Sequence, residues 1–361
     1  MNSLNGKKWL AGSFAAGALL LGSLAATVSA IAQTAPVATP PYKVSVFAQS
    51  PAGISQPDSI VQWHDHIIVG YENHVAKDGT DGKFSTIVEF SLDGKVQRTF
   101  QVQGHNDGLR VVDDDDLWAL QNEDANPNLV VIDLRSGKSK KYQFAPTPHG
   151  GGYDDMVVKG GKVYITASNP NLDAMGNNVF PALVRATLSG STVVLETVLN
   201  GNASATDIPT GSTVTLNLTD PDSMTIDPRG NIVLDSQADS ELVFIRHPLT
   251  DEQTAGRLNI TTTLTGSDGK PSAITLDDTA FATSPKAFLL VADVNAGVVY
   301  RIDAGTFGFE PGTAYSASDT LGLVGTLNLD NGIVTPIVTG FGSARGLIFV
   351  APDGDSSGDD K

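Results

Sequence analysis

One short phrase occurs four times in this chain: an acidic residue that leads into apolar residues with the pattern of a β-strand. The four copies are Pro57-Asp58-Ser59-Ile60, Asn106-Asp107-Gly108-Leu109, Asp154-Asp155-Met156-Val157 and Pro221-Asp222-Ser223-Met224. Successive copies are separated by roughly 45 to 65 residues, which is too long for a leucine-rich or ankyrin repeat and fits one unit of a radial repeat. The chain is therefore predicted to consist of repeated units with one acidic position in each.

Two weaker copies extend this pattern towards the C-terminus. Pro271-Ser272-Ala273-Ile274 has serine where the other copies have an acid, and Ser343-Ala344-Arg345-Gly346-Leu347 has arginine there. We expect the first of these to open a fifth unit and treat the second as a candidate opening of a sixth.

Between the copies, apolar residues alternate with polar ones in short runs that Gly, Asn and Asp interrupt, and a helical period is scarce. Each unit contains four such runs, and four antiparallel strands that repeat radially form the blade of a β-propeller. We therefore expect an all-β fold, a β-propeller with six blades, with seven blades as the alternative. The last blade would contain the strands near 325–329, 333–338 and 347–350. The N-terminal strand near 44–47 would complete it, because closure by both termini removes exposed sheet edges.

The two ends of the chain differ from the repeats. Lys7 and Lys8 precede an apolar run that ends in Ala30-Ile31-Ala32, which is the pattern of a secretory signal peptide. A retained membrane anchor is the alternative, since the run approaches spanning length. We expect a signal peptide at 1–32, a linker at 33–42, a single propeller domain at 43–352 and a disordered acidic tail at 353–361. The mature protein is expected to be exported, to the periplasm or the extracellular space.

Charge and composition exclude several classes of function. The net charge is −17, and removal of residues 1–32 takes away two lysines and no acid, which leaves −19. Such a surface repels nucleic acid and anionic lipid, so we expect a small-molecule ligand and no nucleic-acid or membrane partner. The absence of cysteine rules out disulfides, thiolate chemistry and cysteine zinc sites. The motifs of serine hydrolases and zinc proteases are also absent.

Polar residues gather at one predicted mouth of the central channel, where the innermost strand of each blade begins. These residues are Asp58, Asn106, Asp107, Asp154, Asp155 and Asp222. Carboxylates that converge in this way raise one another's pKa unless a cation lies among them. Carboxylates with Asn carbonyls suit calcium or magnesium better than zinc. The alternative is that these acids accept backbone N–H bonds and cap the strand ends.

Two histidines adjoin the phrases. His105 directly precedes Asn106, and His149 precedes a run of three glycines that leads to the third copy. Both are candidate acid/base groups over the channel mouth. His64 and His66 lie in a predicted turn on the opposite face, and we interpret them as surface residues.

The segment from Pro221 to Val233 resembles the blades of the gluconolactonase-like and NHL-repeat six-bladed propellers. This resemblance implies a divalent metal, often calcium, in the central channel, held by an acid that opens the first blade and by an Asn and an Asp from later blades. By position, Asp58 and Asp222 correspond to the two acids, and Asp155 or Asn106 corresponds to the Asn. The first acid is Glu in the family and the shorter Asp in this sequence.

The same resemblance implies a metal-dependent lactonase, in which the metal polarises a lactone carbonyl and Asp222 or His105 moves the proton. A non-catalytic propeller that binds a ligand or a protein is the competing interpretation, because one fold hosts many functions. A metal-dependent lyase of the streptogramin-inactivating type, with a His base, is a third. The residues leave open whether the chain is an enzyme.

Overall fold

The structure is a computed structural model that describes residues 35–265 and 271–351. The expected signal peptide at 1–32 and the expected tail at 353–361 lie outside these residues. The described residues form strands and loops, with two short 3-10 helices, η1 (Gln237–Asp239) and η2 (Gly305–Phe307). None of their helices is long and apolar enough to cross a membrane. The prediction of an all-β fold is confirmed.

The strands differ in composition according to their depth in a unit. In β4 (His66–Tyr71) and β8 (Asp116–Gln121) nearly every residue is buried, and both read as almost unbroken apolar runs. A strand that is covered on both faces has this pattern. In β10 (Ser139–Phe144) most residues are exposed and polar. The apolar strands are therefore central, and the polar strands lie at the outer edges.

The first three units follow the chain in order, each as an antiparallel array of four strands. The β3–β6 unit is a sheet by itself, whereas a parallel ladder between β10 and β14 joins the next two units into one eight-stranded sheet. The remaining strands of these units are β3 (Pro57–Trp63), β5 (Phe84–Ser91), β6 (Val96–Gln103), β7 (Asn106–Val111), β9 (Asn128–Asp133), β11 (Met156–Lys159), β12 (Lys162–Thr166), β13 (Pro181–Ser189) and β14 (Thr192–Asn200).

The β17–β20 unit comes next and carries an additional hairpin on its outer edge. The hairpin of β15 and β16 attaches through a parallel ladder between β15 and β20. The strands of this sheet are β15 (Ser204–Asp207), β16 (Thr213–Thr215), β17 (Pro221–Ile226), β18 (Ile232–Ser236), β19 (Glu241–Arg246) and β20 (Thr254–Asn259).

The last two units exchange strands along the sequence. β23 pairs with β26 and lies in one sheet with β27 and β28. β24 and β25, which lie between β23 and β26 in the chain, belong to another sheet, in which β24 pairs with β29 and β25 pairs with β2. The bounds are β2 (Lys43–Gln49), β23 (Thr279–Phe281), β24 (Phe288–Asp293), β25 (Val298–Asp303), β26 (Ala314–Ser318), β27 (Leu323–Asn328), β28 (Ile333–Thr339) and β29 (Ala344–Val350).

The N-terminal β2 and the C-terminal β29 lie in one sheet, as expected for closure by both termini. The prediction of which other strands form that sheet was partly wrong. Residues 325–329 and 333–338 belong to β27 and β28 of the neighbouring unit, and β24 and β25 take their place. Local alternation cannot reveal such an exchange, because all of these strands have similar patterns.

Two further expectations need correction. Pro271–Ala273 forms β22, which pairs with β21 (Thr261–Thr265) at the outer edge of a sheet, so it does not open a fifth unit. The innermost strand there is β23, which follows Asp277 and Asp278. Within the expected linker, β1 (Val37–Ala38) pairs with β28, so this part of 33–42 is a strand.

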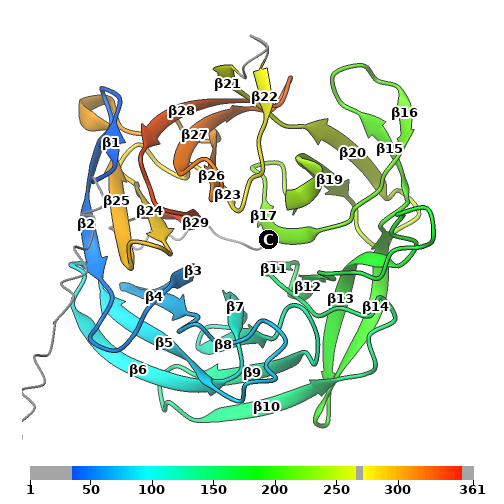
Figure 1. The fold of residues 1–361 in the computed structure, drawn as a ribbon, viewed down its shortest axis with the longest axis horizontal. Coiled ribbons are helices and arrows are strands. Elements are labelled where there is room, and N and C mark those ends of the chain that lie inside the picture. Colours follow the sequence, from blue (N-terminus) through cyan, green and yellow to red (C-terminus); the bar gives the residue numbers. More distant parts are fainter. Residues whose placement is uncertain (1–34, 266–270, 352–361) are drawn as a thin grey trace, which may run out of the picture. The chain divides into compact units, whose positions relative to one another are not determined.

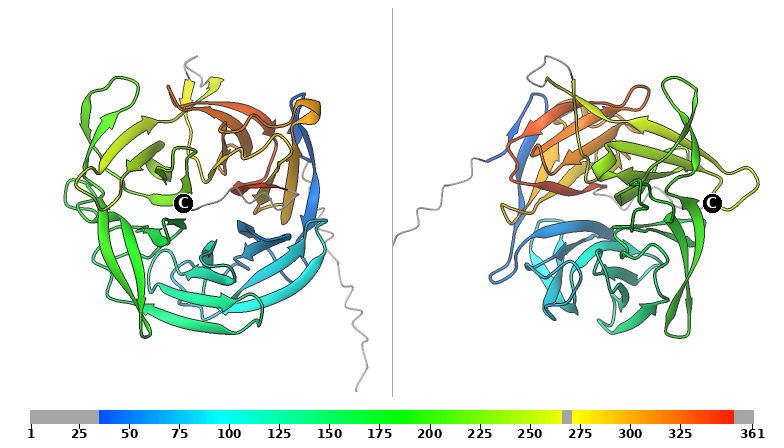
Figure 2. Two further views of the ribbon diagram at one scale, coloured as in Figure 1. Left: turned by 180° about the vertical axis from the view of Figure 1, so that it is seen from behind. Right: turned by 45° about the vertical axis from the view of Figure 1, so that its right-hand side comes forward.

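Hydrophobic clusters lie between neighbouring units. Ile68 and Leu117 share one cluster between the β3–β6 and β7–β10 units, and Ile60 and Leu290 share another between the β3–β6 unit and the closing sheet of β2 and β29. The units therefore form a ring whose innermost strands face a common centre (Figure 1, Figure 2). One ladder merges two units into one sheet, and two other units exchange strands. The number of sheets therefore does not give the number of blades, and six blades stays a prediction.

Candidate functional site

A cavity of about 1730 Å³ runs between the innermost strands. At the end where these strands begin, aspartates line it. Further along, Leu109, Met224, Phe281 and Phe349 add apolar surface. The predicted convergence of acidic residues at the start of the innermost strands is therefore present in the structure.

The strand registers align one residue of each innermost strand. A β-bulge precedes the pairs Ile60–Val69, Leu109–Ala119, Met224–Leu234 and Leu347–Val291, and the ladders of β11 and β23 begin at the matching pairs Met156–Ile165 and Thr279–Ser316. Two residues before the first member of each pair stand Asp58, Asp107, Asp154, Asp222, Asp277 and Arg345, here called the channel ring. The ring thus has a carboxylate in every unit except the closing one, where it has an arginine.

The next residue along each strand connects neighbouring units. Where it is glycine, the strands approach so closely that no side chain fits. A Cβ at Gly108 would lie 2.2 Å from the carbonyl oxygen of Asp154, which accepts the Gly108 N–H at 2.8 Å.

Where the same position is an aspartate, its carboxylate makes the connection. Asp155 Oδ2 accepts the N–H of Met224 at 2.8 Å, and Asp278 Oδ2 accepts the N–H of Leu347 at 2.7 Å. Asp155 therefore accepts a backbone N–H bond at a strand, as the strand-capping interpretation of the acidic phrase predicts.

Arg345 neutralises one sector of the channel ring. Its Nη1 lies 3.0 Å from Glu72 Oε1 and 3.5 Å from Asp58 Oδ2, and its Nε lies 3.6 Å from Asp277 Oδ1. The Asp58 carboxylate raises the pKa of Arg345 above its ordinary value. Burial and the charge of Asp58 raise the pKa of Glu72 to about 8. Burial also raises the pKa of Asp277 well above its usual range, although Arg345 opposes this.

In the other sector, carboxyl groups are in hydrogen-bonding contact with one another. Glu123 contacts Asp107 and Asp154, and Asp154 contacts Asp222. Burial and neighbouring carboxylates raise the pKa of all three aspartates well above the usual range. Burial also opposes ionisation of Glu123, but the hydrogen bond with Asp107 and the ion pair with Lys77 outweigh it and hold its pKa at about 2. This sector therefore combines a lowered pKa at Glu123 with raised pKa values at the ring aspartates.

His105 lies directly behind this sector and is 2% exposed. Its Nδ1 lies 3.0 Å from the carbonyl oxygen of Val75, so Nδ1 is the donor, because a carbonyl only accepts. Among the described residues its Nε2 has no hydrogen-bond partner, and it lies 3.7 Å from Glu123 Oε1 and 3.8 Å from Glu72 Oε1. A histidine that donates one ring N–H to a carbonyl and presents the other nitrogen to carboxylates has the arrangement of a metal ligand.

His105, Asp107 and Glu123 each offer one ligand atom, and these atoms all lie within 4.8 Å of one another. The donor set of one imidazole nitrogen and two carboxylates fits a divalent cation. Lys77, which is half exposed, pairs with Glu123 from the loop between β4 and β5.

The structure distributes the predicted site residues unevenly. Asp58, Asp155 and Asp222 line the cavity, whereas His105 is not among its lining residues. Asn106 is fully buried and points away from the cavity. Its Nδ2 donates to the carbonyl oxygen of Leu120 at 2.9 Å, and its Oδ1 lies so close to Gly70 that a Cβ there would be 2.4 Å away. Asn106 is therefore not among the residues that line the cavity.

His149, the other candidate acid/base group, packs inside its unit. Its Nε2 lies 2.7 Å from the carbonyl oxygen of Gly152, and its ring lies 5.1 Å from that of Tyr153. Burial lowers the pKa of His149, which favours the neutral ring. The structure does not bring it to the cavity.

Several residues of the site were missed in the sequence. Asp277 holds a ring position, and the doubled acid 277–278 was the available signal, because it resembles the doubled acid 154–155, which was placed at the channel mouth. Glu123 and Lys77 lie in loops beyond the ends of β8 and β4, where no periodicity marks them. Arg345 was visible only as the basic residue in the sixth copy of the phrase.

Comparison with known proteins shows the fold and no particular family. Neither a family model nor a curated protein matches the chain. A solved structure of a protein of unknown function from Bacteroides thetaiotaomicron is similar at 11% identity and a TM-score of 0.52, over 84% of this chain and 69% of that one.

Two other solved structures are similar at lower TM-scores. Virginiamycin B lyase from Staphylococcus aureus has 13% identity and a TM-score of 0.44 over 80% of this chain and 86% of that one. A gluconolactonase-like protein has 10% identity and a TM-score of 0.44 over 84% and 82%. At these identities the likeness concerns the fold alone. The strand topology and the similarity to the Bacteroides structure show a β-propeller fold, and this fold encloses an acidic central cavity.

Proposed function

We propose that the protein binds a divalent metal cation through His105 Nε2, Asp107 and Glu123. The unpartnered Nε2, buried between two carboxylates, is the observation that carries this proposal. A buried polar atom without a partner is costly, and a cation would satisfy it together with the carboxylates. Asp154 extends the same set of oxygen donors through its contact with Glu123.

The donor set also bears on which cation is preferred. Carboxylates alone suit calcium, which the sequence led us to expect, whereas an imidazole nitrogen in the set favours manganese or zinc. Lys77 competes with any cation for Glu123, because its ammonium pairs with the same carboxylate.

Calorimetric titration of the metal-stripped protein with Mn²⁺ and Ca²⁺ tests the site. We expect binding to wild type that weakens by about tenfold or more in His105→Gln and Asp107→Asn, on the scale of lost contacts at metal sites. Asp58→Asn is the matched control, since Asp58 belongs to the sector that Arg345 neutralises. Binding that is indifferent to His105 and Asp107 would remove the proposal.

We further propose that the bound cation serves hydrolysis of a cyclic ester, the activity that the resemblance of the blade phrases implies. A divalent cation in this position would polarise the ester carbonyl and lower the pKa of a bound water. Asp222 lines the cavity, and burial raises its pKa well above the usual range, although its contact with Asp154 opposes this. Asp222 is therefore the residue assigned to give a proton to the leaving alcohol. His105, which does not line the cavity, is assigned to the metal.

Turnover of a panel of lactones separates this activity from its alternative. Hydrolysis that requires the metal and is lost in Asp222→Asn, with cation binding retained, supports the hydrolase. Cation binding without turnover of any lactone, or elimination in place of hydrolysis, contradicts it. The first result favours a non-catalytic binding propeller, and the second favours a lyase.

We also propose that the protein works outside the cytoplasm on a small-molecule ligand. Lys7, Lys8 and the apolar run that ends at Ala32 support export, and the net charge of −19 after cleavage disfavours nucleic acid as a partner. Expression of the full chain in a bacterium, with N-terminal sequencing of the protein from each cell fraction, tests this. Full-length protein retained in the membrane would contradict it.

A further inference from the structure

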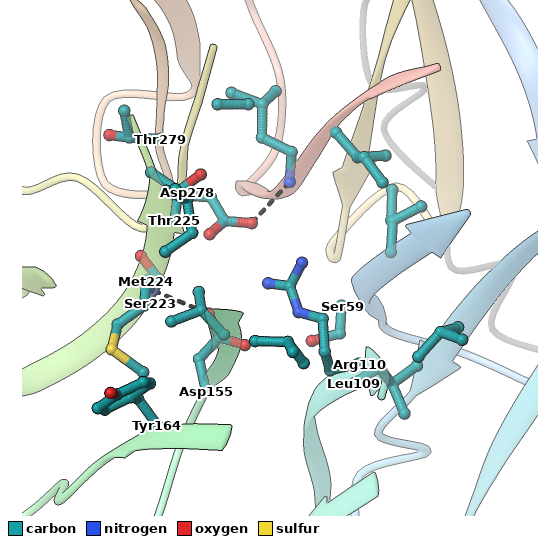
Figure 3. Close-up of a pocket in the computed structure, with 18 of the residues that line it drawn as sticks. Ser59, Leu109, Arg110, Asp155, Tyr164, Ser223, Met224, Thr225, Asp278 and Thr279 are labelled. Atoms are coloured by element: carbon teal, nitrogen blue, oxygen red, sulfur yellow. Dashed lines mark hydrogen bonds between the residues drawn. The ribbon is translucent and has the colours of Figure 1, made fainter. Parts of the chain in front are cut away.

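Arg110 gives the cavity a positive charge that no other described side chain pairs with directly. Its Nε donates to the carbonyl oxygen of Met156 at 2.9 Å, which fixes the side chain across the gap between β7 and β11. Neither Nη has a hydrogen bond or an ion pair within the described part of the chain. Figure 3 shows the guanidinium projecting into the open cavity. Arg110 follows Asp107 by three residues on β7, so it lies roughly 10 Å further along the channel.

The other cations near the channel ring differ from Arg110 in this respect. Lys77 forms an ion pair with Glu123, and Arg345 contacts Glu72 and Asp58. Their charges are therefore already balanced by direct partners. Arg110 combines a fixed position with donors that are free for a ligand.

Two acids share this stretch of the cavity, and in the described part of the chain neither forms an ion pair with Arg110. Asp155 and Asp278 lie on other walls, and each accepts a backbone N–H from the next strand (Figure 3). Burial raises the pKa of Asp278 to about 8 and also raises that of Asp155, although Arg110 opposes the shift at Asp155. Asp278 is therefore mostly neutral at pH 7. Ser59 and Ser223 add hydroxyl groups to the same walls.

We propose that Arg110 anchors a carboxylate-binding subsite, and that the ligand of the cavity is an organic acid whose body is largely apolar. A guanidinium presents paired N–H donors that match the two oxygens of a carboxylate. The apolar body is indicated by Leu109, Met224 and Phe349, which are among the residues that line the cavity.

This inference deepens the proposed function and rests on it only in placing the cyclic ester of the ligand at the channel ring. The carboxylate would then hold the far end of the substrate, and the distance between Arg110 and Asp107 would select its length. The carboxylate subsite itself requires no metal, so the two proposals fail separately.

The test compares acids with their neutral amides on the metal-stripped protein. Hexanoate, phenylacetate and gluconate, each against its primary amide, are titrated and followed by NMR. We expect hexanoate or phenylacetate to bind at least tenfold more tightly than its amide, and this preference to fall below twofold in Arg110→Gln. Gluconate, whose body is polar, is expected to bind more weakly than either. Lys162→Gln removes another positively charged residue of the cavity lining and is expected to leave the preference for the acid unchanged.

The inference is overturned if no acid is preferred over its amide in wild type, if the preference survives Arg110→Gln, or if gluconate alone is preferred. Arg110→Lys checks against a folding artefact. It keeps the positive charge without the paired N–H donors of the guanidinium, so it should retain part of the preference for the acid over its amide. Titration of Arg110→Gln with Mn²⁺ should match wild type. If wild type binds no metal but still prefers the acids, the proposed function is wrong and the carboxylate subsite is still supported.

Discussion

Arg345 on β29 occupies the channel position that Asp58 occupies on β3, and its Nη1 lies 3.5 Å from Asp58 Oδ2. The same guanidinium reaches Glu72 and Asp277, so one cation faces carboxylates from β3, from the end of β4 and from the start of β23. The sheet that both chain termini close therefore also supplies a positive charge, which opposes the raised pKa of Glu72 and of Asp277.

Arg345→Gln should destabilise the protein, because it leaves these carboxylates together without their cation. For a largely buried pair that loses one partner we expect a loss of about 3 kcal/mol at pH 8. At pH 5 the loss should be smaller, since the carboxyls can then take up protons. Urea unfolding of the metal-free protein at both pH values measures this. Lys95→Gln, which breaks the exposed pair with Asp93, serves as control and should have no measurable effect. An equal effect of the two substitutions would contradict this role of Arg345.

The metal-free protein should lose stability as the pH rises above 5. Burial raises the pKa of Asp278 to about 8 and that of Asp235 well above its usual range, and it raises the pKa of Glu241 to about 7 although Arg257 opposes this. A folded-state pKa above the unfolded value means that the native state holds the extra proton. This stability is complete below about pH 4 and is lost as the pH passes through the folded pKa.

Each pH unit over which the native state keeps one extra proton costs about 1.4 kcal/mol. We therefore expect a loss of at least about 2 kcal/mol between pH 5.5 and 8.5 in urea unfolding with a chelator present. Asp235→Asn should flatten this dependence, because both Asp235 oxygens are buried without a hydrogen-bond partner. Stability that rises over this range would show that these acids are ionised in the native state.

Lys77→Met should tighten binding of a divalent cation. Lys77 places its positive charge on Glu123, one of the proposed ligands, and a cation must displace or tolerate it. Removing a half-exposed competing charge is expected to gain about 1 kcal/mol, or roughly fivefold in affinity. Calorimetry with Mn²⁺ measures the gain, and Lys162→Met is the control for general charge. Weaker binding in Lys77→Met would mean that the lysine supports the site instead of competing for it.

The strands and their repetition could be predicted because they depend on local alternation, which residues such as those of β8 show clearly. The exchange of β24 and β25 into the closing sheet could not be predicted, since it depends on which strands pair with each other in the folded ring. The pairing of β22 at an outer edge has the same origin. Three residues with a proline and a small polar side chain look alike at the centre and at the edge of a sheet.

The site was harder to predict than the fold, because it depends on the exact position of single residues in a strand. In the doubled acid 154–155, a shift of one residue decides which side chain enters the channel ring and which one caps the next strand. The ladder of β11 settles this, because Met156 pairs with Ile165 and so places Asp154 level with Asp107. The contribution of His105 depends on a loop contact with Val75, 30 residues away, which no local pattern contains.

Substitution of the two neighbouring acids tests this register directly. Asp155→Ala removes the acceptor of the Met224 N–H and should cost about 1–3 kcal/mol of stability, while cation affinity stays near that of wild type. Asp154→Ala removes a carboxyl from a crowded cluster, so stability should hold or rise while cation affinity falls. Asp155→Asn keeps an acceptor oxygen and is the matched control, with a smaller loss than Asp155→Ala. Urea unfolding and calorimetry on the same preparations give both readouts. The reverse pattern, with Asp155 needed for the cation and Asp154 for stability, would place the channel ring one residue later in this strand.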